Sequence, residues 1–87
     1  MGKMELAEEN LRKAADRMAS DPTVHDHLGD LYQQTGRLKQ AVTQWERSLE
    51  EWRKTIPAEV EQNDVAKVQK KLESAKVKLA KESSDAH

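Results

Sequence analysis

Cysteine and phenylalanine are absent from this sequence of 87 residues, which contains only two tryptophans and one tyrosine. The lack of cysteine excludes disulfides, thiolate catalysis and cysteine zinc sites. Hydrophobic residues make up 36% of the chain, so the core is expected to be small. No apolar run is long enough to cross a bilayer, and the first residues lack the apolar segment of a signal peptide. We therefore expect the chain as given to be soluble and cytoplasmic, although a longer parent could be exported.

The charged residues also argue against several functions. Fifteen basic and sixteen acidic residues leave a net charge of -1, whereas a general nucleic-acid binder needs a positive excess. The sequence has no glycine-rich phosphate loop, nucleophile motif or paired-carboxylate pattern with a pocket to hold it. The sequence therefore predicts no enzymatic activity, no cofactor, no metal, and no nucleic-acid or membrane partner.

Helix-forming residues dominate and strand signals are weak, which predicts an all-α chain of four helices. We expect one domain: a first helix over 4–20, a helical hairpin over 22–55, a linker over 56–63, a last helix over 64–82 and a disordered tail over 83–87. Asp21 can cap the second helix and Pro22 suits its first turn. Gly36 is expected to end that helix in the left-handed conformation, and the short turn predicts an antiparallel pair. Pro57 is the expected helix breaker after residue 54.

The hairpin carries a recognisable pattern of small and large residues. It reads His25-x2-Leu28-Gly29-x2-Tyr32, then Gly36, then Ala41-x3-Trp45. This resembles the tetratricopeptide repeat (TPR), a helix-turn-helix unit of about 34 residues. His25 stands in place of the family's tryptophan, and Arg53 in place of its closing proline. The resemblance implies a stack of antiparallel helical hairpins, with Gly29 and Ala41 where the two helices of the hairpin cross.

The same pattern recurs in part before the hairpin. One repeat length before Ala41, Trp45 and Ser48 stand Ala7, Leu11 and Ala14. The chain thus resembles the C-terminal end of a bacterial TPR protein, with half a repeat, one full repeat and a capping helix, or an excised or engineered fragment of one. The residues expected to carry the repeat signature and its packing are Ala7, Leu11, Ala14, His25, Leu28, Gly29, Tyr32, Gly36, Ala41, Trp45, Ser48 and Leu49.

The resemblance implies a protein–protein interaction or scaffold module without catalytic activity. In the family, the first helix of each repeat lines the groove that binds partner segments. The residues expected to face such a partner are Thr23, Asp26, Asp30, Gln33 and Gln34. Their charge predicts an acidic groove and a basic or polar partner. The alternative is a self-associating structural module that forms a homo-oligomer by helix packing or exchange through Leu11, Trp52, Val68 and Leu72.

Three further patterns have a structural and a functional interpretation. His25 and His27 diverge on a helix, so packing and surface roles are favoured over metal binding. Aromatic residues at helical spacing are more often core than a stacking platform, with Trp52 left open. The last helix has a basic face that is expected to be solvated rather than to bind lipid or nucleic acid. Its lysines are Lys67, Lys70, Lys71, Lys76, Lys78 and Lys81.

Overall fold

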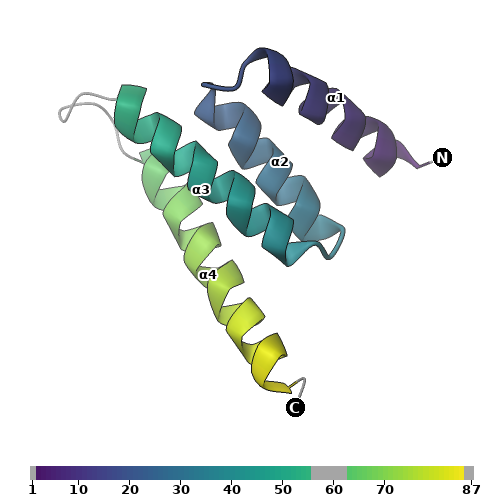
Figure 1. The fold of residues 1–87 in the computed structure, drawn as a ribbon, viewed down its shortest axis with the longest axis vertical. Helices are drawn as coiled ribbons and strands as arrows, with labels where there is room; N and C mark the ends of the chain where they lie inside the picture. The colour runs from purple at the N-terminus through teal and green to yellow at the C-terminus, as the bar shows by residue number, and fades with distance from the viewer. Residues whose placement is uncertain (1, 56–62, 86–87) are drawn as a thin grey trace.

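Four α-helices follow one another in the computed structural model, which describes residues 2–55 and 63–85. They are α1 (Lys3–Arg17), α2 (Pro22–Gln34), α3 (Leu38–Thr55) and α4 (Asn63–Asp85), and the described residues contain no strand. Each helix packs against the next one in the sequence, with α1 and α4 at opposite edges of the molecule (Figure 1). The predicted all-α fold of four helices is therefore confirmed.

The start and end of α2 follow the predicted signals. The Asp21 carboxylate accepts a hydrogen bond from the Thr23 N–H at 2.9 Å, and Pro22 occupies the first helical turn. Gly36 has a φ of 79°, a value that side-chain-bearing residues rarely adopt. This conformation lets the Arg37 N–H donate to the Tyr32 carbonyl at 2.8 Å across the turn. The chain reverses there, and α3 returns antiparallel to α2 (Figure 1).

Several boundaries differ from those expected. The first helix ends at Arg17 rather than at residue 20, because the chain turns before the Asp21 cap, with the Asp21 N–H bonded to the Met18 carbonyl. The last helix begins at Asn63 and continues through Asp85, so residues 83–85, which were expected to be disordered, are helical. The structure does not describe residues 56–62, which make up most of the predicted linker and include the predicted breaker Pro57, or the last two residues.

The core lies where α2, α3 and α4 meet. Leu28 and Tyr32 of α2, with Trp45 of α3, are buried there, as the sequence predicted for the aromatic residues. The other members of the cluster are Ala41, Leu49, Val68, Leu72 and Ala75. Val68 and Leu72, which the sequence analysis offered for self-association, are buried within this chain. They cover the face of α3 that the hairpin alone would expose.

Gly29 sits directly under the indole ring of Trp45. A Cβ atom at this position would lie 2.5 Å from Trp45 Cδ1 and 2.7 Å from Cε2, which is closer than real Cβ contacts allow. The fully buried indole donates its Nε1–H to the Asp26 carbonyl at 3.3 Å. Glycine is needed here because the large side chain of α3, rather than its backbone, occupies the space beside α2.

Two buried polar side chains, Ser48 and His25, form hydrogen bonds at the end of the hairpin away from the turn. The Ser48 hydroxyl of α3 donates to the Pro22 carbonyl at 2.8 Å. The His25 ring contacts the Ala19 carbonyl through Nε2 at 2.7 Å and the Gln44 side chain through Nδ1 at 2.8 Å. Because a carbonyl can only accept, Nε2 carries a proton. His25 thus connects the chain before α2 with α3 through two hydrogen bonds.

Candidate functional site

The residues expected to face a partner lie along the outer face of α2, but they differ in availability. Thr23 and Gln34 are exposed, whereas Asp26, Asp30 and Gln33 are half-buried. Asp26 and Asp30 are one helical turn apart, so their carboxylates point to the same side. Both carboxylates accept a hydrogen bond from one lysine of α4, at 2.6 and 2.8 Å. The acidic pair is therefore already engaged within the chain.

That lysine is Lys71, which connects α4 to α2. Its Nζ also lies 5.7 Å from the centroid of the Trp45 ring, within the range of a cation–π interaction. Burial opposes the charge on Lys71, but the hydrogen bonds to Asp26 and Asp30 outweigh this effect and raise its pKa above the usual 10.5. Lys71 is therefore charged at neutral pH and neutralises part of the acidity of α2.

A second ion pair holds α1 in place. The Arg37 guanidinium donates from Nη1 to Glu8 Oε2 at 2.9 Å and from Nη2 to Glu8 Oε1. Its carbon Cζ lies 4.7 Å from the centroid of the Tyr32 ring, so the guanidinium is positioned by the aromatic face as well. The hydrogen bond from Arg37 lowers the pKa of Glu8, and the same contact raises the pKa of Arg37.

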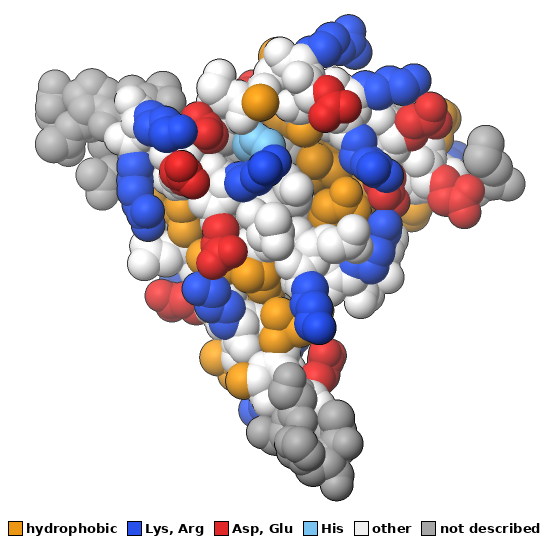
Figure 2. Space-filling model, in the orientation of Figure 1, with side chains coloured by type: hydrophobic (Ala, Val, Ile, Leu, Met, Phe, Trp, Pro, Cys, Tyr) orange, Lys and Arg blue, Asp and Glu red, His pale blue; other side chains and the backbone are white. Residues whose placement is uncertain are grey.

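The first helix is only partly covered by the rest of the chain. Ala7, Leu11 and Ala14 are half-buried, and Leu11 packs against the core cluster. Leu6 of α1 and Met18, the residue that follows this helix, are 56% and 48% exposed. Figure 2 shows hydrophobic side chains between the charged ones near α1 and α3. Leu6 and Met18 are thus exposed at the edge of the molecule that α1 forms.

His25 and His27 lie two residues apart on α2 but have different surroundings. Both ring nitrogens of His25 are used in hydrogen bonds inside the hairpin, while His27 is exposed. Within residues 2–55 and 63–85, no group of three or more His, Asp or Glu side chains is arranged to hold a metal ion. The packing role expected for His25 and the surface position expected for His27 agree with this geometry.

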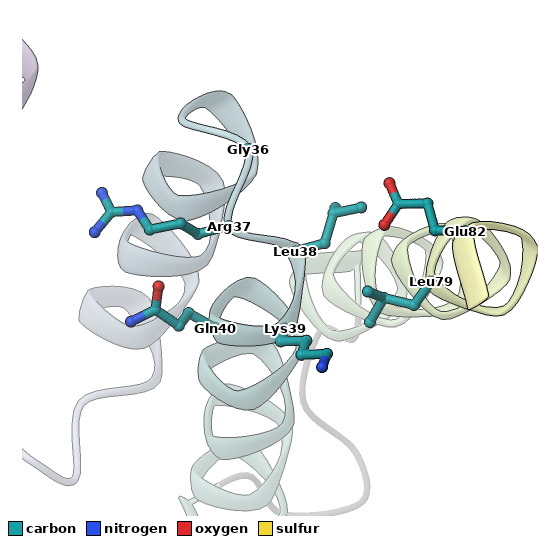
Figure 3. Close-up of a pocket in the computed structure, with 7 residues that line it drawn as sticks. All are labelled: Gly36, Arg37, Leu38, Lys39, Gln40, Leu79 and Glu82. Carbon is teal, nitrogen blue, oxygen red and sulfur yellow. The ribbon is translucent and has the colours of Figure 1, made fainter. Parts of the chain in front are cut away.

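A shallow depression of about 430 Å³ lies where the α2–α3 turn meets the C-terminal part of α4. Leu38, Leu79 and Glu82 face one another across it, while Arg37 and Gln40 point away on the other side of α3 (Figure 3). The remaining lining residues are Gly36 and Lys39. The depression brings together two leucines and the stems of charged side chains, without a nucleophile and base in contact.

The chain was compared with protein-family models, curated proteins and solved structures. No protein-family model, curated protein or solved structure matches it. Among the described helices, none is long and apolar enough to span a membrane. The packing and charges of the residues themselves therefore carry the functional proposal.

The sequence did not predict the contact made by Lys71, because all six lysines of the last helix were expected to lie on one solvated face. A signal was present, because Lys71 lies three residues after Val68 and four before Ala75, beside the apolar seam. Its position next to buried residues distinguishes it from Lys67, Lys70, Lys78 and Lys81, which are exposed. Which acidic residues it would meet depended on how α4 crosses α2, and the sequence did not specify that crossing.

Proposed function

We propose that this chain is a non-catalytic protein–protein interaction module of the tetratricopeptide type, built from half a repeat, one full repeat and a capping helix. The observation that carries the proposal is the packing of Gly29 against Trp45, with Ala41 and Ser48 fully buried beside them. These are the positions at which the repeat pattern requires small residues opposite a large one. Such repeats present helix surfaces to partners.

The partner surface in this proposal is the outer face of α2. Thr23 and Gln34 are its exposed members, and Asp30 lies between them along the helix. Asp30 is half-buried and bonded to Lys71, so changing it would also disturb α4. Thr23 and Gln34 are better test positions, because neither side chain is buried.

The test is quantitative affinity capture with matched variants. Thr23→Glu combined with Gln34→Glu is expected to lose the partners bound by the wild type while keeping its helical circular dichroism. The control changes Gln40 and Thr43 to Glu, two exposed positions on α3. Partners that survive both variants equally would contradict a role for this face of α2.

A second candidate function is self-association, which the exposed side chains of Leu6 and Met18 favour. An exposed apolar stripe is covered by another helix in many assemblies, and a second copy of the chain is one source of it. Leu6→Lys is expected to shift the protein toward monomer in sedimentation equilibrium. Val77→Lys on α4 is the matched control, because Val77 is also 56% exposed. A wild type that is monomeric at all concentrations would exclude this candidate.

A further inference from the structure

The six lysines of α4 fall into two groups. Lys71 is bonded to Asp26 and Asp30 of α2, and Lys76 pairs with Glu46 of α3 at 3.5 Å. Lys67, Lys70, Lys78 and Lys81 are exposed and form no ion pair with any described residue. The lysines that fasten α4 to the rest of the molecule are thus distinct from those that remain available to another molecule.

The four available lysines share one side of the helix. Positions 67, 70, 74, 78 and 81 are spaced by three and four residues, the spacing that aligns side chains along one face of an α-helix. Ser74 occupies the middle position, so no acidic residue interrupts the row. At 1.5 Å per residue, the row extends about 21 Å. We refer to Lys67, Lys70, Lys78 and Lys81 as the lysine row.

The lysine row borders the outer face of α2. Lys71 points at α2, and Lys67 and Lys78 lie one turn before it and two turns after it on nearly the same side of α4. The row therefore continues the surface that begins with Thr23 and Gln34. This surface combines two helices, one of which contributes carboxylates and the other ammonium groups.

The charges on this surface do not cancel. The carboxylates of Asp26 and Asp30 are shared with Lys71, which the hydrogen bonds keep protonated. The lysine row has no corresponding internal partner among the described residues. The lysine row thus adds four ammonium groups beside the acidic face of α2 that the sequence predicted.

We propose that the lysine row is the docking surface for an acidic, Asp- and Glu-rich segment of a partner protein. The inference rests on the proposed interaction function and specifies the chemistry of the partner. Charge complementarity of this kind sets partner choice and accelerates association. Other residues on α4 disfavour a membrane, because its apolar seam of Val68, Leu72 and Ala75 is buried within the chain and is not available for insertion.

Nucleic acid is also a poorer fit. Single-stranded nucleic acid is bound by basic side chains together with aromatic platforms, and the row contains neither an aromatic residue nor an arginine. Tyr32 and Trp45 are buried in the core, so they cannot supply the platform.

The experiment is a fluorescence-anisotropy titration of the full chain against a labelled deca-glutamate peptide. The test variant changes Lys67, Lys70, Lys78 and Lys81 to Gln. The control variant changes the same number of lysines elsewhere, namely Lys3, Lys13, Lys39 and Lys54. We expect the test variant to bind at least about tenfold more weakly at low ionic strength, and the control to stay within about twofold of the wild type.

Three outcomes would overturn the proposal: no peptide binding by the wild type at low ionic strength, equal losses in both variants, or tighter binding to an oligonucleotide or to anionic vesicles. The two proposals can also fail separately. A captured partner that depends on Thr23 and Gln34 but not on the lysine row would keep the interaction function and reject an acidic partner. Binding of the peptide without any captured partner would keep the acidic chemistry of the ligand and reject the interaction function.

Discussion

The carboxylate of Glu8 and the guanidinium of Arg37 form a two-pronged ion pair that ties the first helix to the start of the third. The two residues are 29 positions apart in the chain, and the Arg37 side chain also lies over the Tyr32 ring. Among the described helices, α1 packs mainly against α2, through half-buried side chains, so this pair is a principal polar attachment of the edge helix.

Glu8→Gln is expected to make stability less dependent on pH. The hydrogen bond from Arg37 holds the pKa of Glu8 below its ordinary value of 4.5 in the folded protein. A carboxyl group with a lowered folded pKa contributes stability above pH 4.5 and loses it as the pH falls through the folded pKa. The wild type should therefore melt a few degrees above Glu8→Gln at neutral pH and converge with it in strong acid.

The control for that measurement is Glu9→Gln. Glu9 pairs with Lys13 on the exposed side of the same helix, a kind of ion pair that contributes little. Thermal melts of the wild type, Glu8→Gln and Glu9→Gln across the acidic pH range measure this difference in stability. A constant difference between the wild type and Glu8→Gln at every pH would show that Arg37 is not the cause.

Gly29→Ala should destabilise the protein, although alanine normally stabilises a helix interior relative to glycine by about 1 kcal/mol. The added methyl group would overlap the Trp45 ring, and overpacking of this kind costs about 1–3 kcal/mol in the free energy of unfolding. Urea denaturation measures this change in the free energy of unfolding. In a double-mutant cycle, Gly29→Ala should be less harmful when Trp45 is replaced by Leu; purely additive effects would contradict the clash.

His25→Phe tests the two hydrogen bonds inside the hairpin. The ring would fill a similar space, but the Ala19 carbonyl and the Gln44 side chain would lose their partner. The expected loss in unfolding free energy is about 1–3 kcal/mol. His27→Phe, two residues away and exposed, should change stability by less than about 0.5 kcal/mol. Similar effects at the two positions would count against the proposed role of the His25 nitrogens.

Lys71→Met should loosen α4 while leaving the hairpin intact. The methionine keeps the aliphatic stem but removes the hydrogen bonds to Asp26 and Asp30. Amide exchange in α4 is expected to become about three- to tenfold faster, with little change in α2 and α3. Lys70→Met, on the exposed row, is the control. Since the folded pKa of Lys71 is raised above 10.5, the difference from the wild type should persist at neutral pH and vanish only in strong base.

Local signals predicted much of the fold. The Asp21 cap, Pro22 and Gly36 act through their own backbone neighbours, so the ends of α2 could be read from a few consecutive letters. The apolar spacing of Val68, Leu72 and Ala75 correctly indicated a buried seam. Val68 and Leu72 were also proposed for self-association, because an apolar seam in the sequence does not indicate whether it packs against the same chain or against another copy.

The candidate site was less predictable because its charges come from helices far apart in the chain. Lys71 meets Asp26 only through the angle at which α4 crosses the hairpin, a property of three packed helices rather than of any one of them. The reach of Arg37 to Glu8 depends in the same way on where α1 lies. Both pairs change what the neighbouring surface offers to a partner.

The packing of each helix on its immediate neighbour in the sequence has a kinetic consequence. Contacts between consecutive helices are local, and proteins with such topologies fold within microseconds to milliseconds. The α2–α3 hairpin, with its buried indole and short turn, holds the densest of these contacts and is the natural nucleus. α1 then joins last and opens first, so proteases should reach the N-terminal helix before any other part of the described chain is cleaved.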